Sequence, residues 1–231
     1  MNLIPAHIQA IQHAIRQLTR VEREELAEWI LNSPTFDVRI AETAPAYGGL
    51  HKLTVEEFLR LEENSAINHE YIAGQIFGMT TPLIRHEVIV ANLLFQFQSQ
   101  LGGPCMALSS HTRVRLQVDR EDIFYMPDIT VVCGPFPEEV LDQRYLTNPC
   151  LVVEVTSAST EAIDRREKAL NYRNLPSLEE YLVVAQRSME VTIFRRGENW
   201  LPRVLTKPDD VFESRAVEVN IPLANIYERA L

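Results

Sequence analysis

The 231-residue sequence lacks the patterns that would indicate a membrane location or a familiar nucleotide fold. No apolar run approaches the roughly 20 residues that span a bilayer. The N-terminus, Met-Asn-Leu-Ile-Pro-Ala-His, has no basic start followed by an apolar stretch. There is no GxGxxG or GxxxxGK[ST] phosphate loop, and no GxSxG motif surrounds a serine. We therefore expect a cytoplasmic protein that does not associate with membranes and is not a serine hydrolase.

Cysteine and histidine are too scattered to predict a zinc site or a disulfide framework. The three cysteines, Cys105, Cys133 and Cys150, are odd in number, widely spaced and set in apolar surroundings. The six histidines form no HxH or HxxxH pair. We predict that the cysteines are reduced core residues.

The sequence also lacks an excess of basic residues. Its formal net charge is −10, which offers no general attraction to nucleic acid or to an anionic membrane. Binding to DNA would have to be local, through clusters of Arg and Lys or through a metal ion that offsets an acidic site.

The chain divides near residue 49 into an N-terminal extension and a larger domain. Residues 3–32 have helical periodicity that predicts a helical hairpin, and residues 33–49 contain the Pro and Gly of a linker. We therefore assign 1–48 to a helical extension with its linker and 49–231 to the main domain. A hydrophobic content of 46% is sufficient for a core in that domain.

The main domain alternates helical and strand patterns. Thr54 and Glu57 form the capping box of a helix, and two short strands turn at Ala73-Gly74. The remaining pattern predicts helices over 86–101 and from Ser159 or Thr160 to 174, strands over 111–118, 125–133, 150–156, 181–185 and 191–195, and one or two short strands in the tail. This order indicates an α/β domain with a mixed sheet.

Two of the predicted strands carry a lone carboxylate inside an apolar run. Asp128 lies in Tyr125-Met-Pro-Asp-Ile-Thr-Val-Val, and Glu154 lies in Leu151-Val-Val-Glu-Val-Thr. A buried carboxylate needs a cation, a metal or a proton. If the strands pair, these acids and the Val155 carbonyl can hold Mg²⁺, leaving positions for water and phosphate. The competing interpretation is a salt bridge, for instance with Arg113 or Arg115.

Further polar residues are placed to support such a site. Asp164, Lys168 and Tyr172 lie four apart on one face of the next predicted helix, with Arg165 close by. The lysine can orient an attacking water or stabilise charge on phosphorus, although an ordinary solvated Asp–Lys pair fits the same spacing. Glu70 begins a predicted strand and His86 begins a predicted helix. Each can face the same cleft, as an added metal ligand or a phosphate contact. The alternative for each is an ordinary helix-cap or surface residue.

These motifs together resemble the Uma-type restriction endonucleases of the PD-(D/E)XK nuclease superfamily. The resemblance covers about Leu53 to Arg196. It rests on the following segments, in this order: Glu70-Tyr-Ile-Ala-Gly-Gln-Ile, His86 at a helix start, Met-Pro-Asp128-Ile-Thr-Val-Val, Pro149-Cys-Leu-Val-Val-Glu154-Val-Thr-Ser-Ala-Ser-Thr160, Asp164-Arg-Arg-Glu-Lys168-Ala-Leu-Asn-Tyr172 and Glu180-Tyr-Leu-Val-Val. The resemblance implies a restriction-endonuclease-like mixed β-sheet core flanked by helices, to which the N-terminal helical hairpin is an extension.

The resemblance also implies a chemistry. Asp128 and Glu154 would bind Mg²⁺ or Mn²⁺ for phosphodiester hydrolysis, and Glu70 would complete the acidic cluster. The superfamily's lysine normally follows the glutamate by two residues, but this sequence has Thr156 there. In the Uma-type branch the lysine has moved to the next helix, which indicates Lys168.

We accordingly expect a Mg²⁺-dependent endonuclease acting on DNA. The alternative is a catalytically impaired nuclease fold that serves as a regulatory or interaction module, with the N-terminal helices as a partner or dimer surface. A metal phosphohydrolase for small substrates is a third interpretation. A homodimer is expected because two-fold pairs are the commonest assemblies and two sites suit the cutting of two strands.

Overall fold

The structure, a computed structural model, describes residues 52–79, 81–109, 111–136, 141–156 and 167–231. The predicted helical hairpin, its linker and the boundary near residue 49 lie outside these residues. Among the described helices, none is both long and apolar enough to cross a membrane.

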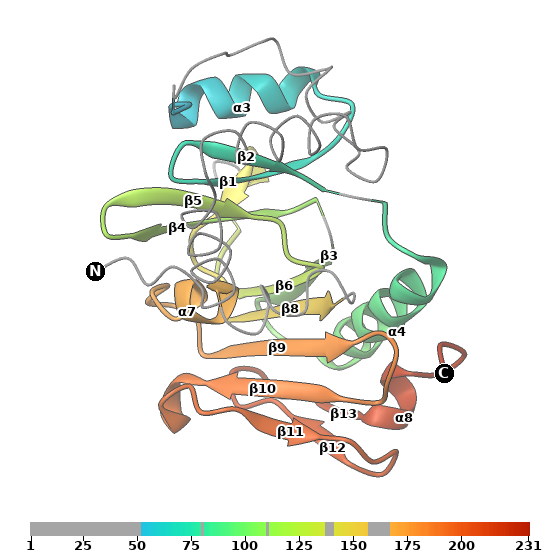
Figure 1. Ribbon diagram of the computed structural model, residues 1–231. Helices are drawn as coiled ribbons and strands as arrows, with labels where there is room; N and C mark the ends of the chain where they lie inside the picture. Colours follow the sequence, from blue (N-terminus) through green and yellow to red (C-terminus); the bar gives the residue numbers. More distant parts are fainter. Residues whose placement is uncertain (1–51, 80, 110, 137–140, 157–166) are drawn as a thin grey trace, which may run out of the picture. The chain divides into compact units, whose positions relative to one another are not determined.

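A six-stranded mixed sheet forms the centre of the described domain (Figure 1). Its strand order is β11-β10-β9-β8-β6-β3, with β8 and β9 parallel and every other pair antiparallel. The strands are β3 (Cys105–Ser109), β6 (Ile129–Cys133), β8 (Leu151–Thr156), β9 (Glu180–Ala185), β10 (Val191–Arg195) and β11 (Arg203–Leu205). Every residue of β8 is buried, because the sheet is covered on both faces there, and this explains its nearly continuous apolar sequence.

A five-stranded sheet has the order β2-β1-β5-β4-β7. It contains β1 (His69–Ile72), β2 (Gln75–Gly78), β4 (Arg113–Val118), β5 (Glu121–Tyr125) and β7 (Tyr145–Leu146). The predicted turn between β1 and β2 is confirmed, and Ala73 and Gly74 both have positive φ angles, as a two-residue hairpin turn requires. A third, two-stranded sheet pairs β12 (Val211–Glu213) with β13 (Asn220–Pro222).

The prediction of one strand over 125–133 is wrong, because the chain changes sheet within it. Strand β5 ends at Tyr125 in the five-stranded sheet, and β6 begins at Ile129 in the six-stranded sheet. Pro127 lies in the break, where its missing N–H costs no ladder hydrogen bond. Asp128 is therefore placed directly before β6, where the two sheets meet.

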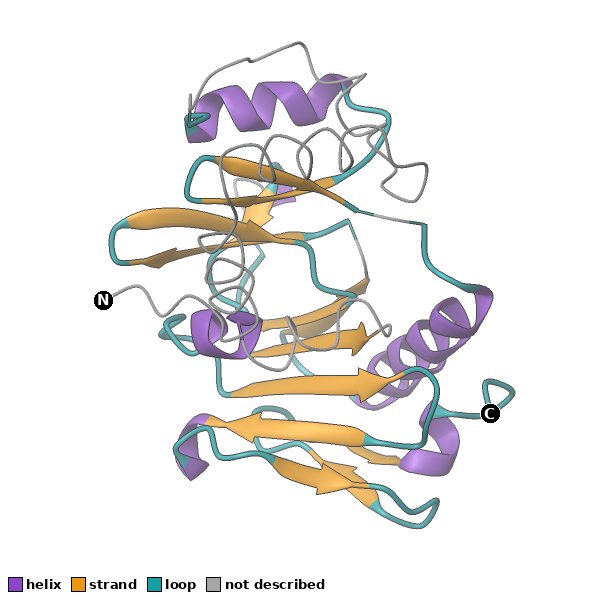
Figure 2. Cartoon of the chain, viewed as in Figure 1, coloured by secondary structure: helices purple, strands orange, loops and turns teal. Residues whose placement is uncertain are grey.

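Helices cover the sheets (Figure 2). They are α3 (Val55–Asn64), α4 (Ile84–Gln100), α7 (Ala169–Tyr172) and α8 (Leu223–Ile226), with a 3₁₀ turn, η3, at Arg196–Glu198. The capping box that Thr54 and Glu57 predict is present at the start of α3. Of the helix predicted to run up to residue 174, the structure describes the part from residue 167 onward. A π-helical turn at 167–168 leads there into α7.

The core has a separate cluster on each face of the central sheet. On one face, Leu93 and Phe97 of α4 pack with Val131, Val153 and Leu182. On the other face, the buried residues come from α7, the central sheet and the five-stranded sheet, and include Val114, Tyr125, Val152, Tyr172 and Tyr181. Alternation along β8 therefore directs Val153 toward α4, and Val152 and Glu154 toward α7.

The prediction that all three cysteines are reduced is wrong. Cys105 and Cys133 form a disulfide, while Cys150 is free. The cause is the antiparallel pairing of β3 with β6, which places Cys105 directly opposite Cys133 although 28 residues separate them. A strand register of this kind cannot be read from the spacing of the cysteines.

Candidate active site

The two predicted metal ligands, Asp128 and Glu154, lie at opposite backbone positions of neighbouring chain segments. Ile129 of β6 pairs with Val153 of β8, and continuing this antiparallel register by one residue sets Asp128 opposite Glu154. Directly opposed residues project from the same face of a sheet. Both side chains are buried, with residue exposures of 9% for Asp128 and 5% for Glu154. The strand register therefore places the two acids of the predicted pair opposite one another, while their sharing of a metal ion stays a prediction.

Lys168 lies between two acids of this cluster. Its Nζ atom is 3.0 Å from Oε1 of Glu154 and 2.9 Å from Oε1 of Glu70. Because the lysine is only 6% exposed, the alternative of a solvated helix face does not hold for it. One lysine from the turn before α7 therefore pairs in the interior with two acids, one from β1 and one from β8.

Two tyrosines support this ion pair. The Tyr172 hydroxyl donates a hydrogen bond of 3.1 Å to Oε1 of Glu154. The Nζ atom of Lys168 lies 5.2 Å from the centroid of the Tyr125 ring, within cation–π range. Asn171 in turn donates a 2.7 Å hydrogen bond to the Tyr125 hydroxyl. Burial, followed by the nearby charge of Glu154, raises the pKa of Tyr172 well above its ordinary value, so that its hydroxyl remains a donor.

Asp128 is held by contacts of another kind. Its Oδ2 accepts a 2.7 Å hydrogen bond from the Val155 amide, and its Oδ1 lies 3.2 Å from Nε2 of His86 at the start of α4. Burial opposes the charged form of His86, but the hydrogen bond and charge of Asp128, aided by Glu87, outweigh it, so the pKa of His86 is raised. The contact seen at Val155 uses its amide; the role of its carbonyl as a ligand stays a prediction.

Glu70 connects the five-stranded sheet to the site. Its Oε1 atom contacts Lys168 and also accepts a hydrogen bond of 3.3 Å from the backbone amide of Met126. Met126 lies in the short connection between β5 and β6 that also contains Asp128. Glu167, the residue before Lys168, is a further acid whose charge interacts with that of Glu70. Burial, followed by the charge of Glu70, raises the pKa of Glu167. Sequence reasoning missed Glu167, Tyr125 and Asn171. The only available signal was their position beside Lys168 and the Pro-Asp pair.

The arginines proposed as competing partners pair elsewhere. Arg113 forms an ion pair with Glu62, and Arg115 lies 2.9 Å from Asp122. Both acids do form salt-bridge contacts, but the partners named as examples are wrong, because Asp128 contacts His86 and Glu154 contacts Lys168. Asp164 and Arg165 lie outside the described residues.

The donor set fits a hard divalent cation that takes few ligands from the protein. Within the described ranges, no group of three or more His, Cys, Asp or Glu side chains is arranged to hold a metal ion. Mg²⁺, however, is usually bound through one or two carboxylates, with waters and substrate phosphate completing its shell. Asp128 and Glu154 offer two oxygen-donor carboxylates, which suit that requirement and do not suit a metal that prefers thiolate or imidazole ligands.

Comparison with known proteins agrees with these observations. Residues 55–224 match the model of a family described as Uma2, putative restriction endonuclease. The chain belongs to the Uma2 family. This match includes all the described site residues, so the resemblance inferred from the motifs is confirmed.

Relatives of this Uma2 chain occur in cyanobacteria. It is 37% identical over 153 residues to the uncharacterized protein slr1290 of Synechocystis sp. (strain ATCC 27184 / PCC 6803 / Kazusa), covering 65% of this chain and 78% of the relative. It is 27% identical over 151 residues to the uncharacterized protein sll1609 of the same strain, covering 64% and 85%.

A solved structure shares the fold. The Uma2 chain aligns with the crystal structure of a putative nuclease belonging to DUF820 from Anabaena variabilis ATCC 29413, with a TM-score of 0.62 and 17% identity, covering 78% of this chain and 99% of the other. At this identity the likeness concerns the fold alone. It confirms the predicted nuclease-like mixed sheet with flanking helices.

Proposed function

We propose that this Uma2 chain is a metal-dependent endonuclease that hydrolyses phosphodiester bonds in DNA. The observation that carries the proposal is the 3.0 Å contact between Lys168 and Glu154, made across 14 residues of sequence. The contact supplies an amine beside the acid pair even though Thr156 stands at the usual lysine position.

In this proposal Asp128 and Glu154 hold Mg²⁺ or Mn²⁺, with the Val155 carbonyl as a further oxygen ligand. The bound cation supplies positive charge that favours attack on the phosphodiester. Lys168 directs the attacking water by hydrogen bonding and stabilises negative charge that develops on the phosphate oxygens. Glu70 keeps the Lys168 amine in position and completes the acidic cluster.

His86 is proposed to contact the phosphate as well as Asp128. Its raised pKa keeps the imidazole protonated over a wider pH range, which favours interaction with an anion. Arg165, Asp164 and Tyr172 are proposed to support the site, Tyr172 through its hydrogen bond to Glu154.

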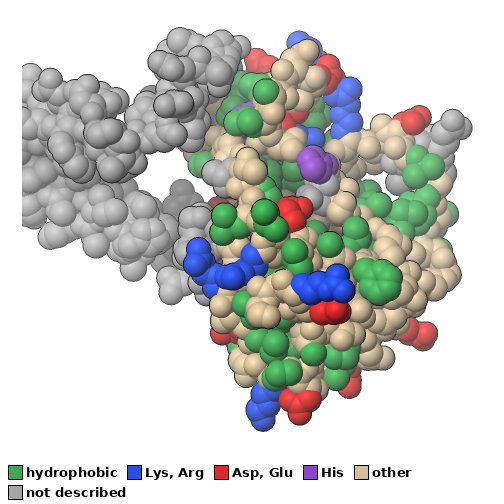
Figure 3. Space-filling view, turned by 90° about the vertical axis from the view of Figure 1, so that its right-hand side faces the viewer, with side chains coloured by type: hydrophobic (Ala, Val, Ile, Leu, Met, Phe, Trp, Pro, Cys, Tyr) green, Lys and Arg blue, Asp and Glu red, His purple; other side chains and the backbone are tan. Residues whose placement is uncertain are grey.

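Binding to DNA is proposed to be local. The net charge of the chain is −10. On the face shown in Figure 3, the described basic side chains form small groups, several of them beside acidic side chains, and do not make a continuous band. Few phosphate contacts should therefore form, and the binding constant should depend only weakly on salt concentration.

Cleavage of supercoiled and linear DNA, with Mg²⁺, with Mn²⁺ and without metal, tests the proposal. Wild-type protein should cut only with metal, and Asp128→Asn, Glu154→Gln and Lys168→Met should each abolish cutting. Glu121→Gln is the matched control, because Glu121 is an exposed acid whose partner is the exposed Lys52. The proposal fails if wild type cuts no nucleic acid, or if the Glu154 variant cuts as fast as wild type.

A second candidate function is a non-catalytic interaction module that retains the nuclease fold. The observation in its favour is that Lys168 forms ion pairs with both Glu70 and Glu154. Calorimetric titration of the full chain with Mn²⁺ separates the two candidates. Binding that Asp128→Asn removes supports the nuclease, whereas absence of both binding and cutting supports the module.

We further propose a homodimer, with residues 1–48 as a partner or dimer surface. Sedimentation of the full chain measures its mass, and a monomer at micromolar concentration would exclude the dimer.

A further inference from the structure

All three cysteines of the chain meet at one end of the central sheet. Cys105 is the first residue of β3, Cys133 is the last residue of β6, and Cys150 directly precedes β8. These strands are neighbours in the order β8-β6-β3. The middle cysteine, Cys133, is therefore within reach of both others.

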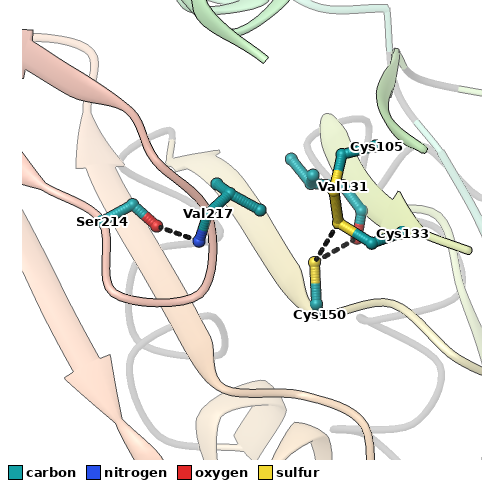
Figure 4. The surroundings of a disulfide bond; sticks show 6 residues. All are labelled: Cys105, Val131, Cys133, Cys150, Ser214 and Val217. Atoms are coloured by element: carbon teal, nitrogen blue, oxygen red, sulfur yellow. Dashed lines mark hydrogen bonds between the residues drawn. A yellow bond between two sulfur atoms is a disulfide. The ribbon is translucent and has the colours of Figure 1, made fainter. Parts of the chain in front are cut away.

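The free thiol lies against the disulfide. The Sγ atom of Cys150 is 3.7 Å from Sγ of Cys133, which is van der Waals contact between sulfur atoms, and it also lies 3.4 Å from the carbonyl oxygen of Val131. The backbone holds Cys150 beside the end of β6, since its amide donates a 2.9 Å hydrogen bond to the carbonyl oxygen of Val131. Figure 4 shows the Cys150 sulfur at the Cys133 end of the disulfide, on the side away from Cys105.

We propose that these three cysteines form a thiol–disulfide exchange site in which Cys133 is bonded to Cys105 or to Cys150. Exchange proceeds by attack of a thiolate on a disulfide sulfur. The Cys150 thiol gives its proton to solvent, and its thiolate forms a bond to Sγ of Cys133 as the bond from Cys133 to Cys105 breaks. Cys105 leaves as a thiolate and takes a proton from solvent. The step conserves one disulfide and one thiol, so no oxidant or reductant is consumed.

The exchange would change which strands are cross-linked. The present disulfide ties β3, at the edge of the sheet, to β6. The alternative disulfide would tie β6 to β8. Strand β6 begins directly after Asp128, and strand β8 contains Glu154. The exchange itself is independent of nuclease activity, so its test and that of the proposed function can fail separately.

Mapping of the single free thiol in the full-length wild-type protein tests the exchange. Oxidised protein is incubated, quenched with acid to stop exchange, unfolded, alkylated at mildly acidic pH and digested, and the alkylated cysteine is identified by mass spectrometry. Because the chain has only three cysteines, each molecule with one disulfide carries one label. The expected result is a shift of part of the label from Cys150 to Cys105 as incubation lengthens.

Cys150→Ser is the matched control, because it keeps the disulfide and removes the attacking thiol. It should acquire no label. Label confined to Cys150 in the wild type at every time would overturn the proposal. So would equal labelling of Cys105 in the wild type and in the control, because the disulfide would then open by another route.

Discussion

Replacement of Lys168 by Met tests whether the amine neutralises buried acids. Its Nζ atom contacts Glu70 at 2.9 Å and Glu154 at 3.0 Å, and the three side chains are 8%, 14% and 6% exposed in the order Lys168, Glu70 and Glu154. Removing one partner of a buried ion pair costs about 3–5 kcal/mol, because the remaining charge has no compensation. Here two carboxylates lose their partner, so we expect the upper part of that range at pH 8.

The loss should shrink at acid pH. At pH 8 the variant buries two negative charges without a compensating cation. Acid removes negative charge from carboxylates in the folded and the unfolded chain alike, so little uncompensated charge then opposes folding. The difference in unfolding free energy between variant and wild type should therefore be small near pH 4 and largest near pH 8.

Urea unfolding followed by circular dichroism measures this difference at each pH. Lys52→Met is the matched control, because Lys52 pairs with Glu121 at 3.2 Å with both side chains more than half exposed. Its loss should be below about 1 kcal/mol at either pH. Adding Glu154→Gln to Lys168→Met should recover part of the loss. An equal loss at pH 4 and pH 8 would refute the role of Lys168 as the neutralising group.

Three further predictions concern other contacts. Protonated His86 competes for Asp128, so the affinity for Mn²⁺ measured by calorimetry should fall as pH drops through the raised His86 pKa, and His86→Gln should flatten this dependence. Burial raises the pKa of Cys150 to about 11. The thiolate fraction, and with it the rate at which label moves between cysteines, should rise about 100-fold from pH 7 to pH 9, and a rate independent of pH would contradict this. Glu180→Gln leaves buried Arg195 without the carboxylate that lies 2.7 Å from its Nε, so unfolding in urea should show a loss of about 3–5 kcal/mol. Full stability of that variant would show that the pair is dispensable.

Local patterns in the sequence were sufficient for most elements of the fold. The Thr54–Glu57 capping box and the Ala73-Gly74 turn depend on residues a few positions apart, and both are present. Strands β8, β9 and β10 follow apolar runs whose identity does not depend on their neighbours. The pattern failed at 125–133, because a continuous apolar run carries no mark of a change from one sheet to another.

The sequence by itself determined that Asp128 and Glu154 would be buried, because each is a lone carboxylate within an apolar run and burial follows from those neighbours. The sequence also pointed to Lys168 and His86 as site residues, but only the tertiary structure decided which acid each one contacts. It alone also decided that Cys105 meets Cys133, through strand register. Register and sheet order are properties of long-range packing, which local spacing does not encode.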